Sequence, residues 1–229
     1  MRATLRALGD GKIASHSSGF FKAFPGGYGE GDHFLGIRVP VVRKQVKTFR
    51  DAPLRAVRAM LRSKYHEERL FAVLLLADQY RRGDEGSRQQ IYDLYMDNRA
   101  HVNNWDIVDS SAHLIVGPQL ERGDRSVLVS LAHSDVLWDR RIAMMATYHT
   151  IRKNEFRDAL KIARVLRDDP HDLIHKVVGW MLREIGNRDR EAEERFLKSH
   201  YQKMPRTMLR YAIEKFPERR RKAYLHGRI

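Results

Sequence analysis

Cysteine is absent from the 229 residues of the chain. This absence excludes disulfides, thiolate nucleophiles and thiolate metal ligands, and it fits a reducing compartment. No apolar run comes near the roughly 18 residues that a membrane-spanning helix requires. The N-terminal stretch MRATLRALGDGK lacks the apolar core of a secretory signal. We therefore expect a cytoplasmic protein that does not enter membranes.

Acidic residues are scarce relative to basic ones. Lysine and arginine together number 43 against 29 aspartates and glutamates, which gives a formal net charge of +14. A soluble protein with such an excess usually binds a polyanion, and nucleic acid is the commonest polyanion in a cell. The alternative is a protein that is basic without such a partner.

Strand-length alternation of apolar and polar residues is also hard to find, which favours an all-helical chain. Two short helices are expected before Lys22, broken at Gly9–Gly11, and Pro40 suits the first turn of the next helix. Asp169 followed by Pro170 is typical of a helix start, with the acid as N-cap. Glycine and proline predict further breaks near residues 51–53, 82–84, 122–124, 168–170, 186–187, 204–205 and 216–217.

The chain has one glycine-rich segment, Pro25–Asp32. It lacks the Lys-Ser/Thr of a phosphate-binding loop and the GxGxxG spacing of a dinucleotide site. We interpret it as a loop. A turn of the chain is favoured over a ligand contact, because glycine permits positive φ there.

A faint internal repeat is present. Segments that begin at Arg69, Asp106, Arg141 and Lys176 are 37, 35 and 35 residues apart, and a further candidate begins at Thr207. Helix pairs at such a step are typical of an α-solenoid of the tetratricopeptide, HEAT or armadillo kind. The sequence therefore predicts a single all-α domain over residues 1–229, a solenoid whose concave, basic groove suits an extended anion such as DNA.

The stretch Asn103–Gly117 has the apolar spacing of a helix. On such a helix Trp105 and Asp109 are four residues apart and share a face. A carboxylate beside an indole can stabilise a positive charge that develops in a reaction. The alternative is structural: Trp105 in the core, and Asp109 paired with Arg140 or Arg141.

Equivalent positions of successive repeats hold the other unusual residues: Asp106 with Asp109, Arg140 with Arg141, and Lys176 with Trp180. Trp105, Asp109, Arg141 and Trp180 thus form a candidate site of two aromatics, one acid and one cation. We assign Trp138 to the core.

Six segments in order resemble one family over essentially the whole chain. They are FLGIRVP at 34–40 with Arg43 and Lys44 after it, NWDIVD at 104–109, LWDRRIA at 137–143, IRKNEF at 151–156, HKVVGWMLRE at 175–184 and MPRTMLRYAIE at 204–214. This pattern is similar to that of the AlkD-like alkylpurine DNA glycosylases, which are built of HEAT-like repeats. The segment Tyr28–Asp32 differs from the loop of the best-described members, which leaves the range of lesions open.

The resemblance implies roles for the four candidate residues. Asp109 takes the place of the catalytic aspartate, Trp105 and Trp180 those of the tryptophans that hold the deoxyribose, and Arg141 that of an arginine near the phosphate backbone. The implied reaction is excision of 3-methyladenine and 7-methylguanine from duplex DNA, with no metal or other cofactor. We further predict that scattered cations hold the backbone: Arg38, Arg43, Lys44, Lys47, Arg140, Lys176 and Arg183. A monomer is expected, because one solenoid can wrap a duplex unaided.

The residue types suit this chemistry on their own. An N3- or N7-alkylated purine is already cationic and leaves as a neutral base without a general acid. One carboxylate can stabilise the remaining sugar cation and orient water, so a second carboxylate is not required. Because no lysine is singled out as an imine-forming nucleophile, a monofunctional enzyme is favoured.

Two other motifs point elsewhere. His171 and His175 have the spacing of a zinc helix, but Asp172 stands where that motif has glutamate and no third ligand is evident. The basic run 218–222 suits either phosphates or a solvated helix face.

Two other functions stay open: a non-catalytic repeat protein that binds branched or damaged DNA, and a scaffold for a protein partner.

Overall fold

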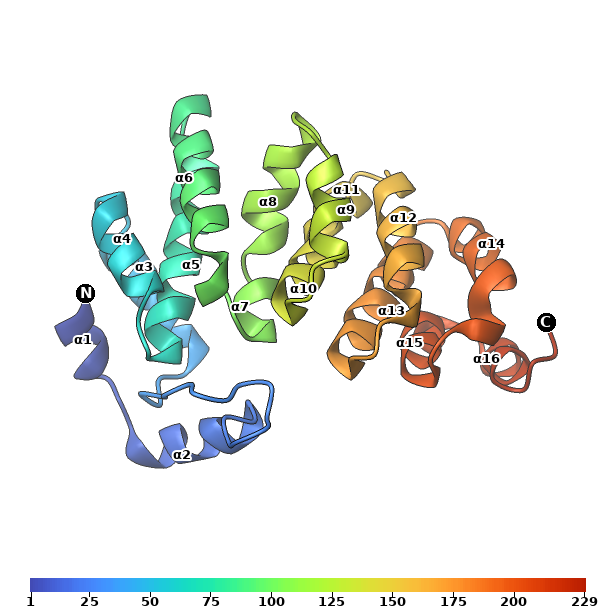
Figure 1. Cartoon of the computed structure of the whole chain (residues 1–229), viewed down its shortest axis with the longest axis horizontal. Helices are drawn as coiled ribbons and strands as arrows, with labels where there is room; N and C mark the ends of the chain where they lie inside the picture. The colour runs from blue at the N-terminus through green and yellow to red at the C-terminus, as the bar shows by residue number, and fades with distance from the viewer. The chain divides into compact units, whose positions relative to one another are not determined.

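The computed structural model describes residues 1–229, which form α-helices and short 3-10 helices joined by turns (Figure 1). No strand is formed, and the only sheet-like pairing is an isolated bridge between His33 and Tyr65. No helix combines the length and the apolar character that crossing a bilayer requires. The chain divides into two compact units, Met1–Ile115 and Val116–Ile229.

The first unit is built around α5 (His66–Arg82), whose residues from Leu70 to Ala77 are all buried. This helix packs against α3 (Val39–Thr48), α4 (Leu54–Leu61), α6 (Glu85–Asp97) and α7 (Trp105–Asp109). A fully buried leucine or phenylalanine contributes about 1.5–3 kcal/mol by leaving water, so this apolar run stabilises the unit strongly. The other elements of the unit are α1 (Arg2–Arg6), α2 (Gly11–Phe20) and η1 (Arg99–His101).

The second unit is built around α13 (Asp172–Gly186). This helix packs against α10 (Leu137–Ala146), α12 (Arg157–Val165), α14 (Arg190–His200) and α15 (Arg206–Ala212). The helix α8 (Ala112–Glu121) begins in the first unit and ends in the second. The remaining elements are α9 (Ser126–Ala132), α11 (Tyr148–Ile151), η2 (Leu166–Asp168), η3 (Tyr201–Lys203), η4 (Ile213–Lys215) and α16 (Glu218–Leu225).

The predicted all-α repeat fold is confirmed. The segments aligned in the sequence begin within α5, α7, α10, α13 and α15, and helices of an α-solenoid follow one another at these intervals. The predicted breaks fall between helices, Pro40 lies in the first turn of α3, and the glycine-rich segment is a loop. Trp138 is buried, as expected.

Two details of the sequence prediction are wrong. The stretch Asn103–Gly117 is not one helix: it breaks at Ser110–Ser111, and α8 then continues past Gly117. The Ser111 hydroxyl donates to the carbonyl of Ile107 at 2.7 Å, so a side chain competes with the backbone there.

The second error concerns the start of α13. Its N-cap is His171, whose Nδ1 accepts the amide hydrogen of Leu173 at 3.1 Å. Asp169 instead accepts from the amide of His171 and pairs with Arg140, so its carboxylate is not available to cap the helix.

The carboxyl group of Glu193 on α14 is buried against α13. A Cβ on Gly186 would overlap this carboxyl group, so glycine at that position makes room for it. Its Oε1 has no hydrogen-bond partner. Burial raises the pKa of Glu193 from 4.5 to about 8, because it outweighs the attraction of Arg190.

Glu193→Gln should therefore stabilise the protein at alkaline pH. The pKa of this carboxyl group is higher in the folded than in the unfolded chain, so folding becomes less favourable as pH rises from 4.5 to about 8. The glutamine variant lacks this dependence. We expect its free energy of unfolding to exceed that of the wild type by roughly a few kcal/mol at pH 8.5 and by much less at pH 5. Urea unfolding measures both, with the exposed Glu191→Gln as control. A gap that is the same at the two pH values would contradict this reading.

Candidate functional site

The short helix α7 begins at a strained residue. Its N-cap, Asn104, is buried and has φ 90°, a conformation that side-chain-bearing residues rarely adopt. The Asn104 side chain accepts the amide hydrogen of Trp105 at 2.9 Å and donates to Asp32 at 3.4 Å. Such strain costs about 1–3 kcal/mol and persists only where surrounding contacts impose it. The start of α7 is therefore held in place by its environment.

Trp105 and Asp109 occupy one face of α7. Both are partly exposed, whereas Ile107 and Val108 between them are fully buried. Both residues belong to one helix, as expected, and residues four apart on a helix lie on the same face. A joint role of the indole and the carboxylate stays a prediction.

Aromatic side chains from the end of α2 support Trp105. The Trp105 ring lies 5.3 Å from that of Phe21 and 5.9 Å from that of Phe20, which meets it edge-on. Phe20 is 57% exposed, so the aromatic surface continues from the indole toward solvent. An exposed aromatic surface of this kind suits stacking on a sugar or a base.

The Phe21 ring also contacts His66, the buried centre of a group of charges, the Asp32–His66–Asp106 cluster. The His66 Nδ1 is 3.2 Å from an Asp32 oxygen, and its Nε2 is 2.8 Å from an Asp106 oxygen. Arg69 donates to the other Asp32 oxygen at 2.6 Å. Burial opposes protonation of His66, but the hydrogen bonds to Asp106 and Asp32 prevail and raise the pKa of His66 to about 9. Burial likewise opposes ionisation of Asp32, but His66 and Arg69 lower its pKa.

Most of this cluster was not predicted from the sequence. Asp106 was singled out as an unusual residue of the repeats, whereas Asp32 and Arg69 marked only the ends of segments and His66 was not recognised. One signal was available: the four polar residues His66–Arg69 run directly into the apolar LFAVLLLA of the same helix. Charged side chains are rarely buried unless they are paired. Charged residues at the start of a buried apolar helix therefore indicate partners elsewhere in the chain.

Arg141 and Trp180 lie in the second unit. Arg141 on α10 is 4% exposed, and its guanidinium donates to the carbonyl of Leu173 at the start of α13 at 2.7 Å. Trp180 on α13 is partly exposed, and its indole N–H donates to Glu184 at 3.3 Å. Its ring lies 6.2 Å from that of Tyr148. Trp105 and Asp109 are thus brought together in one unit and Arg141 and Trp180 lie in the other, and a single site of all four stays a prediction.

The predicted DNA-binding cations fall into two groups. Four on and before α3 are exposed and have no carboxylate partner: Arg38, Arg43, Lys44 and Lys47. The other three each pair with an acid of the same unit. Arg140 donates to Asp169 at 2.6 Å, Lys176 lies 2.9 Å from Asp172, and Arg183 forms an ion pair with Glu214. The α3 group is therefore the one whose charges are most available to phosphates.

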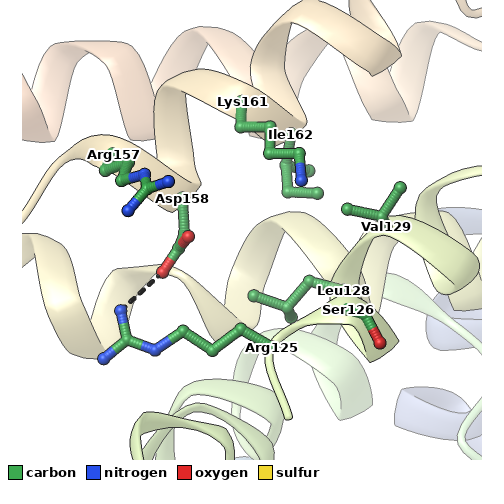
Figure 2. A pocket seen from close by; sticks show the side chains of 8 residues that line it. All are labelled: Arg125, Ser126, Leu128, Val129, Arg157, Asp158, Lys161 and Ile162. Atoms are coloured by element: carbon green, nitrogen blue, oxygen red, sulfur yellow. Dashed lines mark hydrogen bonds and ion pairs between the residues drawn. The ribbon is translucent and has the colours of Figure 1, made fainter.

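A pocket of about 400 Å³ opens between α9 and α12 in the second unit. Figure 2 shows Arg125 reaching Asp158 across it, with Arg157 and Lys161 on the same wall as Asp158. The guanidinium of Arg125 donates to the Asp158 carboxylate at 2.8 Å. None of the predicted site residues lines it. Its cations can attract an anion, but neither Arg141 on α10 nor Trp180 on α13 contributes to its lining.

No group of three or more histidines, aspartates or glutamates is arranged to hold a metal ion. His171 and His175, which have the spacing of a zinc helix, have other partners. His171 caps α13, and Nε2 of His175 lies 2.5 Å from the carbonyl of Asp169.

Comparison with known proteins identifies the family. Residues 1–216 match the family model of DNA alkylation repair enzymes. No curated protein matches the sequence. A solved structure described as a predicted DNA alkylation repair enzyme from Enterococcus faecalis is similar, with a TM-score of 0.71 and 17% identity over 92% of this chain and 98% of that one. At this identity the structural likeness concerns the fold. Because the family model covers nearly the whole chain, the protein belongs to the family of DNA alkylation repair enzymes.

Proposed function

We propose that the protein is a monofunctional DNA glycosylase that hydrolyses the N-glycosidic bond of cationic alkylated purines in duplex DNA, chiefly 3-methyladenine and 7-methylguanine. The observation that carries the proposal is that Trp105 and Asp109 lie four residues apart on α7 and are both partly exposed. Membership of a DNA-repair family and a net charge of +14 support duplex DNA as the substrate.

The reaction begins with the departure of the base. Alkylation at N3 or N7 gives the purine a positive charge. When the bond between C1′ and N9 breaks, its electron pair passes to the purine, which leaves as a neutral base. The deoxyribose becomes an oxocarbenium cation. Water then adds to C1′ and loses a proton, which leaves an abasic site.

Asp109 stabilises the sugar cation and orients the attacking water. The Trp105 ring packs on the sugar, where its π face adds about 0.5–2 kcal/mol of cation–π stabilisation. A group that is already held in position before the reaction stabilises the transition state more than a group that must first reorganise. The buttressing of Trp105 by Phe21 and the fixed start of α7 supply such preorganisation.

In the second unit, we propose that Trp180 packs on the deoxyribose and that Arg141 binds the phosphate backbone. Both roles rest on the resemblance to the glycosylase family. The partial exposure of Trp180 supports its role. Arg141 is buried, so we expect its guanidinium to bind a phosphate from its present position, with its hydrogen bond to the carbonyl of Leu173 retained.

Release of free 7-methylguanine and 3-methyladenine from methylated duplex DNA tests the proposal. Mass spectrometry of the released bases should show both, with one abasic site for each base. If the intact protein binds DNA in a salt-sensitive way and releases no base, it is a non-catalytic DNA-binding protein. Weak DNA binding at moderate salt would favour a protein scaffold.

The salt dependence of DNA binding should show whether the cations on α3 contact phosphates. Each phosphate contact contributes a slope of about −0.9 to log K against log[salt]. The double variant Arg43→Ala/Lys44→Ala is therefore expected to make the slope shallower by about 2, measured by fluorescence anisotropy with a duplex.

Arg157→Ala/Lys161→Ala is a matched control. It removes one arginine and one lysine, both exposed and without a carboxylate partner, from α12. It should leave the slope nearly unchanged. An equal change in both double variants would mean that net charge, and not the α3 surface, determines binding.

The proposal includes a monomer that acts in the cytoplasm. The absence of cysteine supports a reducing compartment. Sedimentation of the protein with and without a short duplex measures the number of copies in the complex.

A further inference from the structure

We propose that His66 is a positioning residue for the reaction: as an imidazolium held between Asp32 and Asp106, it fixes the first turn of α7 and so the placement of Trp105 and Asp109. This inference rests on the proposed function. It concerns a side chain that does not touch the substrate and acts through the helix that carries the reacting residues.

The geometry of the cluster requires a doubly protonated ring. Both ring nitrogens of His66 face carboxylate oxygens, at 3.2 Å and 2.8 Å. An ionised carboxylate can only accept hydrogen bonds, and a neutral imidazole has a single N–H. A neutral His66 would therefore turn a lone pair toward one of the two acids. The imidazolium satisfies both.

The cluster joins three parts of the first unit. Asp32 ends the glycine-rich loop, His66 is the first residue of α5, and Asp106 lies in the first turn of α7. Asp32 lies 34 positions before His66 in the chain, and Asp106 lies 40 positions after it. The loop, whose role the sequence left open, thus supplies one of the two acids that hold the imidazolium.

Asp106 is held in the cluster by its hydrogen bond with His66. Its Oδ2 binds Nε2 of His66, while its Oδ1 is buried and has no hydrogen-bond partner. Loss of the imidazolium would leave this carboxylate buried and uncompensated, which is costly. Rotation of α7 toward solvent would relieve that cost, and Trp105 and Asp109 would move with the helix.

The aromatic contacts supply a second link to the site. The Phe21 ring lies 4.7 Å from that of His66 and 5.3 Å from that of Trp105. Phe34 stacks on His66 at 4.9 Å. These rings keep water from the cluster, so a change in its charge is poorly screened. They also transmit a shift of the imidazole directly to the indole.

The charged groups around His66 are Asp32 from the loop, Arg69 from α5 and Asp106 from α7. The other acids of the first turn of α5 are bound elsewhere: Glu67 to the amides of residues 35–37, and Glu68 to Arg2 and Arg6. The pKa of His66 rises from 6.5 in the unfolded chain to about 9. The stabilisation is therefore complete below pH 6.5 and is lost as pH rises through about 9.

The test is the pH dependence of base release under single-turnover conditions, with rates in protein-free DNA subtracted. The wild-type rate should fall at alkaline pH with one ionisation near 9. His66→Gln can donate to only one of the two acids, so its rate at pH 7 should be about tenfold lower. Its alkaline decrease should be absent.

Asp106→Asn is the conservative partner variant. An asparagine amide can donate to the Nε2 of a neutral His66, while Nδ1–H still donates to Asp32. This variant should therefore keep its rate at pH 9.5 better than the wild type does. An alkaline decrease near 9 that persists unchanged in both variants would overturn the role of His66.

A second measurement does not depend on glycosylase activity. The fluorescence of Trp105, obtained by difference from Trp105→Phe, should change with the same ionisation in the intact protein. If no base is released but this change occurs, the proposed reaction fails while the coupling of His66 to α7 stands. If Trp105 does not respond up to pH 10, the coupling is refuted whatever the activity.

Discussion

Asp109→Asn is expected to lower the single-turnover rate of 7-methylguanine release by at least about 100-fold at pH 7, the size of effect seen when one preorganised electrostatic group is lost from an active site. Asparagine has nearly the shape of aspartate but no charge, so it cannot stabilise the oxocarbenium cation. Affinity for undamaged duplex should change by less than about threefold, because a carboxylate makes no favourable contact with phosphates.

Asp97→Asn provides the control for this variant. Asp97 is exposed at the end of α6 in the same unit, so its replacement removes the same charge away from the indole. Release by this control should match the wild type. If Asp109→Asn also releases base at the wild-type rate, Asp109 is not the reacting carboxylate.

Gly36→Ala is expected to destabilise the protein by roughly 2–5 kcal/mol, in the range of severe single substitutions. Gly36 has φ 81°, and a Cβ there would lie 2.0 Å from the carbonyl oxygen of Asp10 and 2.6 Å from the nitrogen of Ala14. Both neighbours are backbone atoms, so neither can move away without shifting α2. The amide N–H of Gly36 also donates to the carboxylate of Glu67 at 2.8 Å.

Gly31→Ala separates the two causes. Gly31 has φ 84°, but a Cβ there meets nothing within 4 Å. Its replacement should cost only the conformational penalty, about 1 kcal/mol. Urea unfolding of the two variants gives the difference. Equal losses would mean that the close approach at Gly36 is relieved without cost.

Local signals accounted for much of the fold in advance. Gly9–Gly11 does separate two short helices, Pro40 does lie in the first turn of α3, and each aligned repeat segment does begin within a helix. These features depend on residues close together in the chain, where φ preferences and apolar spacing are decisive. The two errors arose where a side chain found a partner that local rules do not weigh: Ser111 with the carbonyl of Ile107, and Asp169 with Arg140.

The candidate site divides in the same way. The shared face of Trp105 and Asp109 follows from a spacing of four on a helix, and α7 confirms it. The contacts of His66 join residues that are 34 and 40 positions apart, and no periodicity marks such pairs. The partners of Arg140 and Arg183 are likewise distant in the chain, which is why sequence alone presented them as available cations.

The attachment of α2 has a consequence for local stability. This helix buries none of its residues, and among residues 1–36 only Leu5 is a buried apolar side chain. The segment is held by charges, backbone hydrogen bonds and partly exposed rings, and not by an apolar core of its own. Regions with few buried apolar contacts open at lower free energy than the whole domain unfolds. Hydrogen exchange in α2 would therefore be faster than in α5, and a duplex that approaches Trp105 would meet the part of the unit that rearranges at least cost.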